Sequence, residues 1–159
     1  MKETPKSKVT PGVVKMFKIT MSDRFARIQG NPYRILAVPS NYSLYKFAEV
    51  IIKSFKFSFD HCFGFFDNLK NIYESNEGYE LFKDIGEETE FKSVKKNKIL
   101  KVFDTIGKKM CFMFDYGDDW RFIVEFIDEE TVPNIKKYPK LIESKGKAPG
   151  QYPDYSEEN

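Results

Sequence analysis

Histidine and cysteine, on which most zinc and redox sites depend, are scarce in this sequence. Of 159 residues one is a histidine, His61, and two are cysteines, Cys62 and Cys111, which lie far apart and form no CxxC pair. A disulfide framework or a Cys/His metal site would therefore have too few members. We expect both cysteines to be reduced and buried. We expect no cofactor, with a divalent metal held by carboxylates left open.

Long apolar runs are absent, and the net charge is small. No stretch approaches the roughly 18 apolar residues of a membrane span. The polar start, MKETPKSKVTPG, lacks the pattern of a signal peptide. We therefore expect a cytoplasmic protein with no membrane partner. The net charge of +2 gives no case for nucleic-acid binding from bulk charge, and no glycine-rich phosphate loop is found.

Aromatic side chains are abundant instead. They make up 16% of the residues, with 16 Phe and 9 Tyr, beside 41% hydrophobic and 31% charged residues. This composition predicts one globular domain with a core rich in phenylalanine. We expect a flexible tail over residues 1–12, a single domain over 13–127, and an irregular arm over 128–159 that partly packs on the domain.

Apolar periodicity predicts both strands and helices. Strands are expected at residues 13–21, 33–38 and 55–66, and in a hairpin at 108–126. Helices are expected over 40–55, with Ser43 as N-cap, and over 93–107, with Ser93 as N-cap. This order favours an α+β fold, with a mainly antiparallel or mixed sheet and two main helices packed on one face.

The most distinctive stretch is FDYGDDWRFIVEF, residues 114–126, in which three aspartates surround one glycine. Asp115, Asp118 and Asp119 could bind a divalent cation, with Asp60 or Glu125 nearby, and support metal-assisted hydrolysis. In the alternative, Asp119 caps backbone N–H groups in a hairpin turn. A third possibility is a salt bridge from Asp115 or Asp119 to Arg34.

His61 and Trp120 also have two interpretations each. His61 could act as a general base beside Asp60, or lie with the phenylalanines of strand 55–66 in the core or at its rim. Trp120 could stack on a ligand, or belong to the core. We assign no catalytic residue. Asp115, Asp118, Asp119, Trp120, His61 and Arg34 are the candidate binding residues.

Lysines form the densest positive stretch, between residues 92 and 109. On the expected second helix, Lys95 and Lys98 share a face and Lys101 follows nearby. These three side chains are candidate contacts to nucleic-acid phosphates, or simply a solvated face. Few arginines accompany them, which argues against base reading.

Four stretches together resemble the plasmid pRiA4b ORF-3-like family: PYRILAVPSNYSLYKFAEVI, FSFDHCFGF, FDYGDDW and YPKLIESKGKAP. The resemblance covers roughly residues 14–153, and FDYGDDW is its most specific part. It implies an α+β domain without an established activity, and an association with mobile elements that rests on gene neighbourhood. The resemblance also implies that relatives often carry histidines where this chain has Ala48, Phe63 and Phe122. If those histidines form a metal or proton-transfer site in relatives, apolar side chains replace it here.

Three functions follow as hypotheses. The first is a non-enzymatic binding module that contacts its partner through aromatic residues around Trp120 and in the C-terminal arm. The second is a nucleic-acid-associated accessory protein of mobile elements. The third is a divalent-metal-dependent hydrolase that uses the three aspartates. The partner, protein or nucleic acid, and the oligomeric state stay open.

Overall fold

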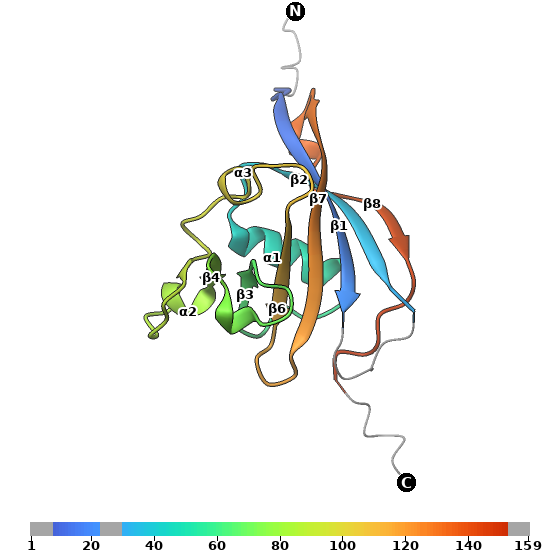
Figure 1. Cartoon of the computed structure of the whole chain (residues 1–159). Helices are drawn as coiled ribbons and strands as arrows, with labels where there is room; N and C mark the ends of the chain where they lie inside the picture. The colour runs from blue at the N-terminus through green and yellow to red at the C-terminus, as the bar shows by residue number, and fades with distance from the viewer. Residues whose placement is uncertain (1–7, 23–29, 153–159) are drawn as a thin grey trace, which may run out of the picture.

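An eight-stranded sheet forms the centre of the fold (Figure 1). The computed structural model describes residues 8–22 and 30–152. The strands lie in the order β5-β4-β3-β6-β7-β1-β2-β8, and every neighbouring pair is antiparallel except β4 and β5. The expected α+β class with a mainly antiparallel, mixed sheet is confirmed. The strands are β1 (Gly12–Ser22), β2 (Tyr33–Pro39), β3 (Phe63–Phe66), β4 (Gly78–Glu80), β5 (Lys92–Ser93), β6 (Lys109–Phe114), β7 (Trp120–Val132) and β8 (Lys140–Lys145).

Within the described part of the chain, α1 (Leu44–Ser54) is the one helix with more than four residues. The expected N-cap is confirmed, because the Ser43 side chain accepts a hydrogen bond from the backbone N–H of Lys46. The other helical segments are single turns, and none of the helices could cross a membrane. They are η1 (Ile72–Glu74), α2 (Leu81–Asp84), α3 (Ile99–Val102) and η2 (Ile135–Lys137).

The second main helix, expected over residues 93–107, is not found. The backbone before α3 instead accepts hydrogen bonds from the first turn of α1. Leu44 N–H donates to Asn97 C=O at 2.9 Å, and Tyr45 N–H donates to Val94 C=O at 3.2 Å. The first N–H groups of a helix have no partner within that helix. Tertiary hydrogen bonds to α1 thus take the place of local helical ones, and Ser93 lies in β5 rather than at a helix start.

Phenylalanine side chains join α1 to the middle of the sheet. The Phe47 ring lies 4.5 Å from that of Phe17 on β1 and 5.8 Å from that of Phe65 on β3, measured between ring centroids. On the sheet, the Phe112 ring contacts the rings of both Phe63 and Phe122. Ala48, Phe63 and Phe122, where the family resemblance leads us to expect histidines in relatives, are fully buried in this core.

Two expected segments differ from the structure. The strand expected over 55–66 is reduced to β3, because residues 57–62 have no neighbouring strand and Ser58 bonds the side chain of Gln151 instead. After Ile127 an irregular arm was expected, yet β7 continues to Val132 and β8 pairs with β2. The division into tail, domain and arm stays a prediction, and residues 1–7 of the expected tail lie outside the described residues.

Arg34 joins β2, the end of α1 and the end of β8. Its guanidinium donates to the carbonyl oxygens of Ser54, Tyr33, Lys145 and Gly146 at 2.9–3.2 Å. It also lies over the Phe55 ring, 4.5 Å from the centroid, and only 6% of the residue is exposed. The predicted salt bridge from Arg34 to Asp115 or Asp119 is therefore wrong, since backbone carbonyls take the guanidinium donors.

We expect Arg34→Met to lower the free energy of unfolding by about 2–4 kcal/mol, because partly buried carbonyl oxygens lose their donors. The amides of residues 140–145 should also exchange faster, since β8 loses an attachment. Chemical denaturation and hydrogen exchange measure the two effects. Lys70→Met, on an exposed loop, is the control and should change stability by less than about 0.5 kcal/mol. Equal stability of the two variants would contradict this role for Arg34.

Candidate functional site

The FDYGDDW stretch forms the turn between β6 and β7, and Asp115 organises it. Its Oδ1 accepts hydrogen bonds from the backbone N–H groups of Gly117 and Asp118 at 3.1 and 3.2 Å. Asp115 and Asp119 have positive φ angles of 67° and 54°, which aspartate tolerates better than most residues. The turn interpretation is therefore supported, with Asp115 rather than Asp119 as the residue that caps the backbone.

Asp119 pairs with Arg121 two residues later. Arg121 Nε lies 2.7 Å from Asp119 Oδ1, and its Nη2 lies 3.3 Å from Oδ2. Both side chains are largely buried, and the hydrogen bond to Asp119 raises the pKa of Arg121. This two-point contact anchors the start of β7.

His61 lies between two carboxylates at the rim of the core, where its ring is 6.0 Å from that of the buried Phe114. Its Nδ1 is 2.7 Å from Asp60 Oδ1, and its Nε2 is 3.4 Å from Asp115 Oδ2. The side chain is 38% exposed, because the chain around it is not a strand. The hydrogen bond to Asp60 raises the pKa of His61, Asp115 and Asp118 add to this effect, and partial burial opposes it.

Residues 151 and 152 close over this cluster. The buried Gln151 side chain bonds both the N–H and the C=O of Ser58, at 2.7 and 3.1 Å. The Tyr152 hydroxyl donates to Asp60 Oδ2 at 2.5 Å, which lowers the pKa of Asp60 and raises the pKa of Tyr152 to about 12. The cluster thus holds the end of the described chain against residues 58–61.

Trp120 lies in the core, where it is 3% exposed and its ring is 5.2 Å from that of Phe57. A contact surface centred on Trp120 is therefore wrong, because the side chain is covered. Lys95, Lys98 and Lys101 are exposed but do not share a helical face, because α3 spans only Ile99–Val102. Lys95 Nζ lies 4.8 Å from the centroid of the Tyr45 ring.

Over residues 8–22 and 30–152, no three or more His, Cys, Asp and Glu side chains are placed to hold a metal ion. The reason is visible in the turn: Asp115 Oδ1 accepts two backbone N–H groups, and both oxygens of Asp119 face Arg121. The three aspartates therefore do not form the predicted cation site. Ligand binding by the six candidate residues stays a prediction.

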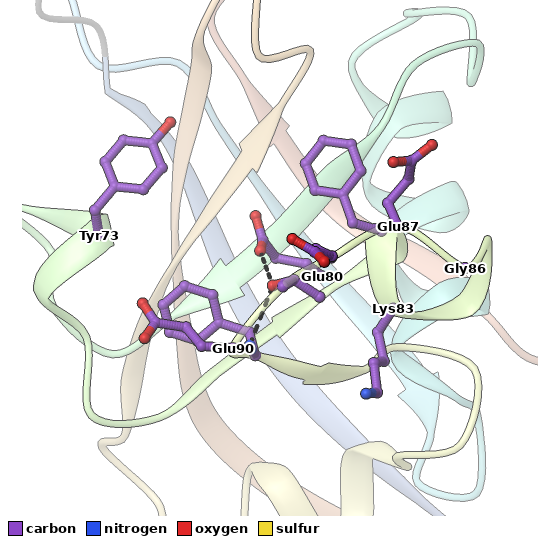
Figure 2. A pocket seen from close by; sticks show the side chains of 10 residues that line it. Tyr73, Glu80, Lys83, Gly86, Glu87 and Glu90 are labelled. Atoms are coloured by element: carbon purple, nitrogen blue, oxygen red, sulfur yellow. Dashed lines mark hydrogen bonds between the residues drawn. The ribbon is translucent and has the colours of Figure 1, made fainter.

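A hollow of about 860 Å³ lies beside β4 and is a better candidate site (Figure 2). It opens between η1, α2 and the loop over residues 86–91, and Figure 2 shows Glu80 between Tyr73 and Glu87. Its lining holds four glutamates, one lysine and three aromatic rings. The lining residues are Tyr73, Glu80, Phe82, Lys83, Gly86, Glu87, Glu88, Thr89, Glu90 and Phe91. We call this hollow the acidic pocket.

Glu80 is the fixed carboxylate of the acidic pocket and is only 5% exposed. The Thr89 hydroxyl donates to its Oε1 at 2.6 Å, and the Tyr116 hydroxyl donates to its Oε2. The Tyr116 ring lies 4.7 Å from that of Phe82, and burial together with Glu80 raises the pKa of Tyr116. The FDYGDDW turn therefore places Asp115 beside His61 and Tyr116 beside the acidic pocket.

Sequence reasoning missed the acidic pocket, although one signal was available. Residues 85–90, IGEETE, form an acidic loop between Phe82 and Phe91. Continued strand alternation would place Tyr116 on the same face as Phe114. The left-handed backbone at Asp115 turns Tyr116 instead toward the cluster around Phe66 and Met113.

Comparisons with known proteins were informative in two cases. Residues 15–153 match the family model described as plasmid pRiA4b ORF-3-like protein. The crystal structure of MM3350, a protein of unknown function from Methanosarcina mazei Go1, has the same fold, with a TM-score of 0.67 and 19% identity over 83% of this chain and 69% of that chain. A search of curated proteins found no match.

The role of Asp115 in the turn predicts that Asp115→Ala lowers the free energy of unfolding by about 1–3 kcal/mol. Alanine makes neither side-chain hydrogen bond and tolerates positive φ poorly. Asp115→Asn should stay within about 1 kcal/mol of the wild type, since asparagine retains an acceptor oxygen and suits this backbone. Chemical denaturation of both variants is the measurement, with Asp118→Asn as the exposed control. Equal losses for Ala and Asn would refute the capping role.

The raised pKa of His61 predicts a pH-dependent contribution to stability. The contribution should be complete below the ordinary pKa of 6.5, and should be lost as the pH rises through the higher folded-state pKa. Asp60 stays ionised in this window because its own pKa is lowered. We expect the stability difference between wild type and His61→Gln to shrink as the pH rises above 6.5, measured by denaturation. A difference that does not vary with pH would contradict the pairing.

Proposed function

The chain belongs to the plasmid pRiA4b ORF-3-like family, and from that premise we propose that it is a non-enzymatic binding module. Its ligand is a basic segment of a partner protein, which it holds in the acidic pocket. The observation that carries the proposal is the lining of the acidic pocket, in which four carboxylates and three aromatic rings surround a hollow of about 860 Å³ with one lysine at its edge.

The charge of the lining favours a cation. The described lining holds four glutamates, Glu80, Glu87, Glu88 and Glu90, and one lysine, Lys83. A concave surface of one sign of charge concentrates ligands of the opposite sign. Carboxylates and aromatic faces are also the groups that hold Lys and Arg side chains at protein interfaces, through charge-assisted hydrogen bonds and cation–π contacts.

The geometry favours a chain segment over a single ion. The volume lies within the roughly 300–1,000 Å³ of pockets that enclose ligands of many atoms. Glu87, Glu88 and Glu90 are exposed on one loop, while Glu80 is fixed below by Thr89 and Tyr116. The row of exposed carboxylates suits several basic side chains at once, while Glu80, whose oxygens bond Thr89 and Tyr116, holds the loop in place.

The other two hypotheses have less support. The nucleic-acid hypothesis relied on a shared helical face for Lys95, Lys98 and Lys101, and α3 is too short to provide it. The hydrolase hypothesis relied on Asp115 and Asp119, whose oxygens face donors of the chain itself. A binding module needs neither arrangement.

Fluorescence anisotropy with a labelled Lys- and Arg-rich peptide tests the proposal. The affinity should fall about tenfold in Glu87→Gln/Glu90→Gln, since two charge pairs are removed, and should weaken as salt rises. Asp128→Asn/Glu130→Gln removes two exposed carboxylates of β7 and is the matched control, with unchanged affinity expected.

Either of two results would overturn the proposal: no binding of the basic peptide at low salt, or equal loss of affinity in the pocket and control variants. Binding of a labelled DNA duplex in place of the peptide would instead favour the nucleic-acid hypothesis. The peptide should be short and flexible, so that charge and fit decide the affinity.

A further inference from the structure

The far edge of the sheet carries a second hollow, which lies away from the acidic pocket. It measures about 540 Å³ and lies between one side of α1 and β8. Leu36, Val50, Pro139 and Leu141 supply its apolar surface, while Lys46, Lys53 and Lys140 bring positive charge to it. We call it the basic groove. Figure 1 shows β8 at one side of the sheet and β4 with α2 at the other.

The strand that borders the basic groove is an edge strand. Over residues 8–22 and 30–152, β8 has one strand neighbour, β2. All six residues of β8 are exposed, including Leu141 at 52% and Ile142 at 51%. An edge strand presents backbone N–H and C=O groups that another extended chain can pair with. The opposite edge strand, β5, has only two residues.

We propose that β8 and the basic groove together bind an extended segment of a partner protein that carries both apolar and acidic side chains. The segment adds to the edge of β8 as a further strand, so its backbone supplies affinity and its side chains supply specificity. Apolar side chains on the α1 side enter the groove over Leu36 and Leu141. Neighbouring carboxylates meet Lys46, Lys53 and Lys140.

The charge of the residues around the basic groove favours an acidic partner segment. Among the described residues that line the groove, Glu49 is the one carboxylate, and it pairs with Lys53 at 3.4 Å. Lys46 Nζ lies 5.2 Å from the centroid of the Tyr42 ring, and Lys140 Nζ lies 4.6 Å from that of Tyr138, so these aromatic rings orient the two ammonium groups beside the groove. The groove therefore has two more lysines than glutamates to attract an anionic partner.

The same lysines argue against a second copy of this chain as the occupant. Lys140 and Lys145 stand at the two ends of β8, and lysines on an edge strand discourage pairing of identical strands through like-charge repulsion. An acidic partner turns this repulsion into attraction. A small apolar carboxylate would suit the groove but would leave the backbone groups of β8 unpaired, so a polypeptide uses more of the observed surface.

Fluorescence anisotropy with a labelled peptide rich in Glu, Leu and Val tests the inference, beside the same peptide N-methylated at alternate residues. N-methylation keeps the charges and side chains but removes backbone donors. We expect binding of the first peptide, a loss of about tenfold or more on N-methylation, and slower hydrogen exchange of the amides of residues 140–145 in the complex.

Lys46→Glu/Lys140→Glu reverses the charge of the groove and should abolish measurable binding, whereas Lys95→Glu/Lys101→Glu changes two exposed lysines elsewhere and should leave the affinity within about twofold. Leu141→Asp should also abolish binding. Circular dichroism checks that each variant is folded, and Glu87→Gln/Glu90→Gln should bind the acidic peptide normally, which separates this site from the acidic pocket.

Three results would overturn the inference. The first is equal binding of the normal and N-methylated peptides, or binding of neither. The second is binding of decanoate in the groove without binding of the peptide, which would make the site one for a small apolar anion. The third is a dimer in analytical ultracentrifugation that Leu141→Asp dissociates, which would make β8 an interface between two copies.

Discussion

A mismatch between a wide sheet and one helix shapes this structure. Eight strands at about 4.8 Å spacing make a sheet roughly 34 Å wide. A helix of 11 residues is only about 16 Å long. α1 packs over the middle strands, where Phe47 meets Phe17 and Phe65, and it cannot reach both edges. The basic groove lies where this cover ends, beside α1 and β8, whereas Glu80 of the acidic pocket bonds Tyr116, which packs with Phe66 and Met113 away from α1.

The two ends of the sheet differ in charge. At the β4 end the exposed loop carries glutamates around a buried carboxylate, and at the β8 end lysines from α1 and β8 flank an apolar groove. A net charge of +2 conceals this separation, since the two sets nearly cancel in the sum. Surfaces so far apart are screened from each other by salt, because the Debye length is about 8 Å at physiological ionic strength.

The FDYGDDW turn connects the core to the acidic end. Because Asp115 adopts a left-handed backbone conformation, Asp115 and Tyr116 contact different neighbours. Asp115 caps the turn and lies beside His61, while Tyr116 donates a hydrogen bond to Glu80 in the acidic pocket. Two of the aspartates that suggested a cation site, Asp115 and Asp119, thus hold the turn in place. What they do for a binding site is indirect, through the placement of Tyr116.

The sequence alone determined the elements whose residues bury one regular face. Ser43 and the spacing from Leu44 to Ile52 predict α1, and alternation predicts β1, β2 and the β6–β7 hairpin, because periodic burial marks these segments whatever their neighbours are. Only the tertiary structure decided the rest. The expected helix over residues 93–107 does not form, because their backbone bonds the first turn of α1. The side chain of Gln151 bonds the backbone of Ser58 in the segment expected as a strand, and the basic groove combines segments distant in the chain. Such contacts depend on which segments become neighbours in the fold, and the periodicity within one segment does not predict its neighbours.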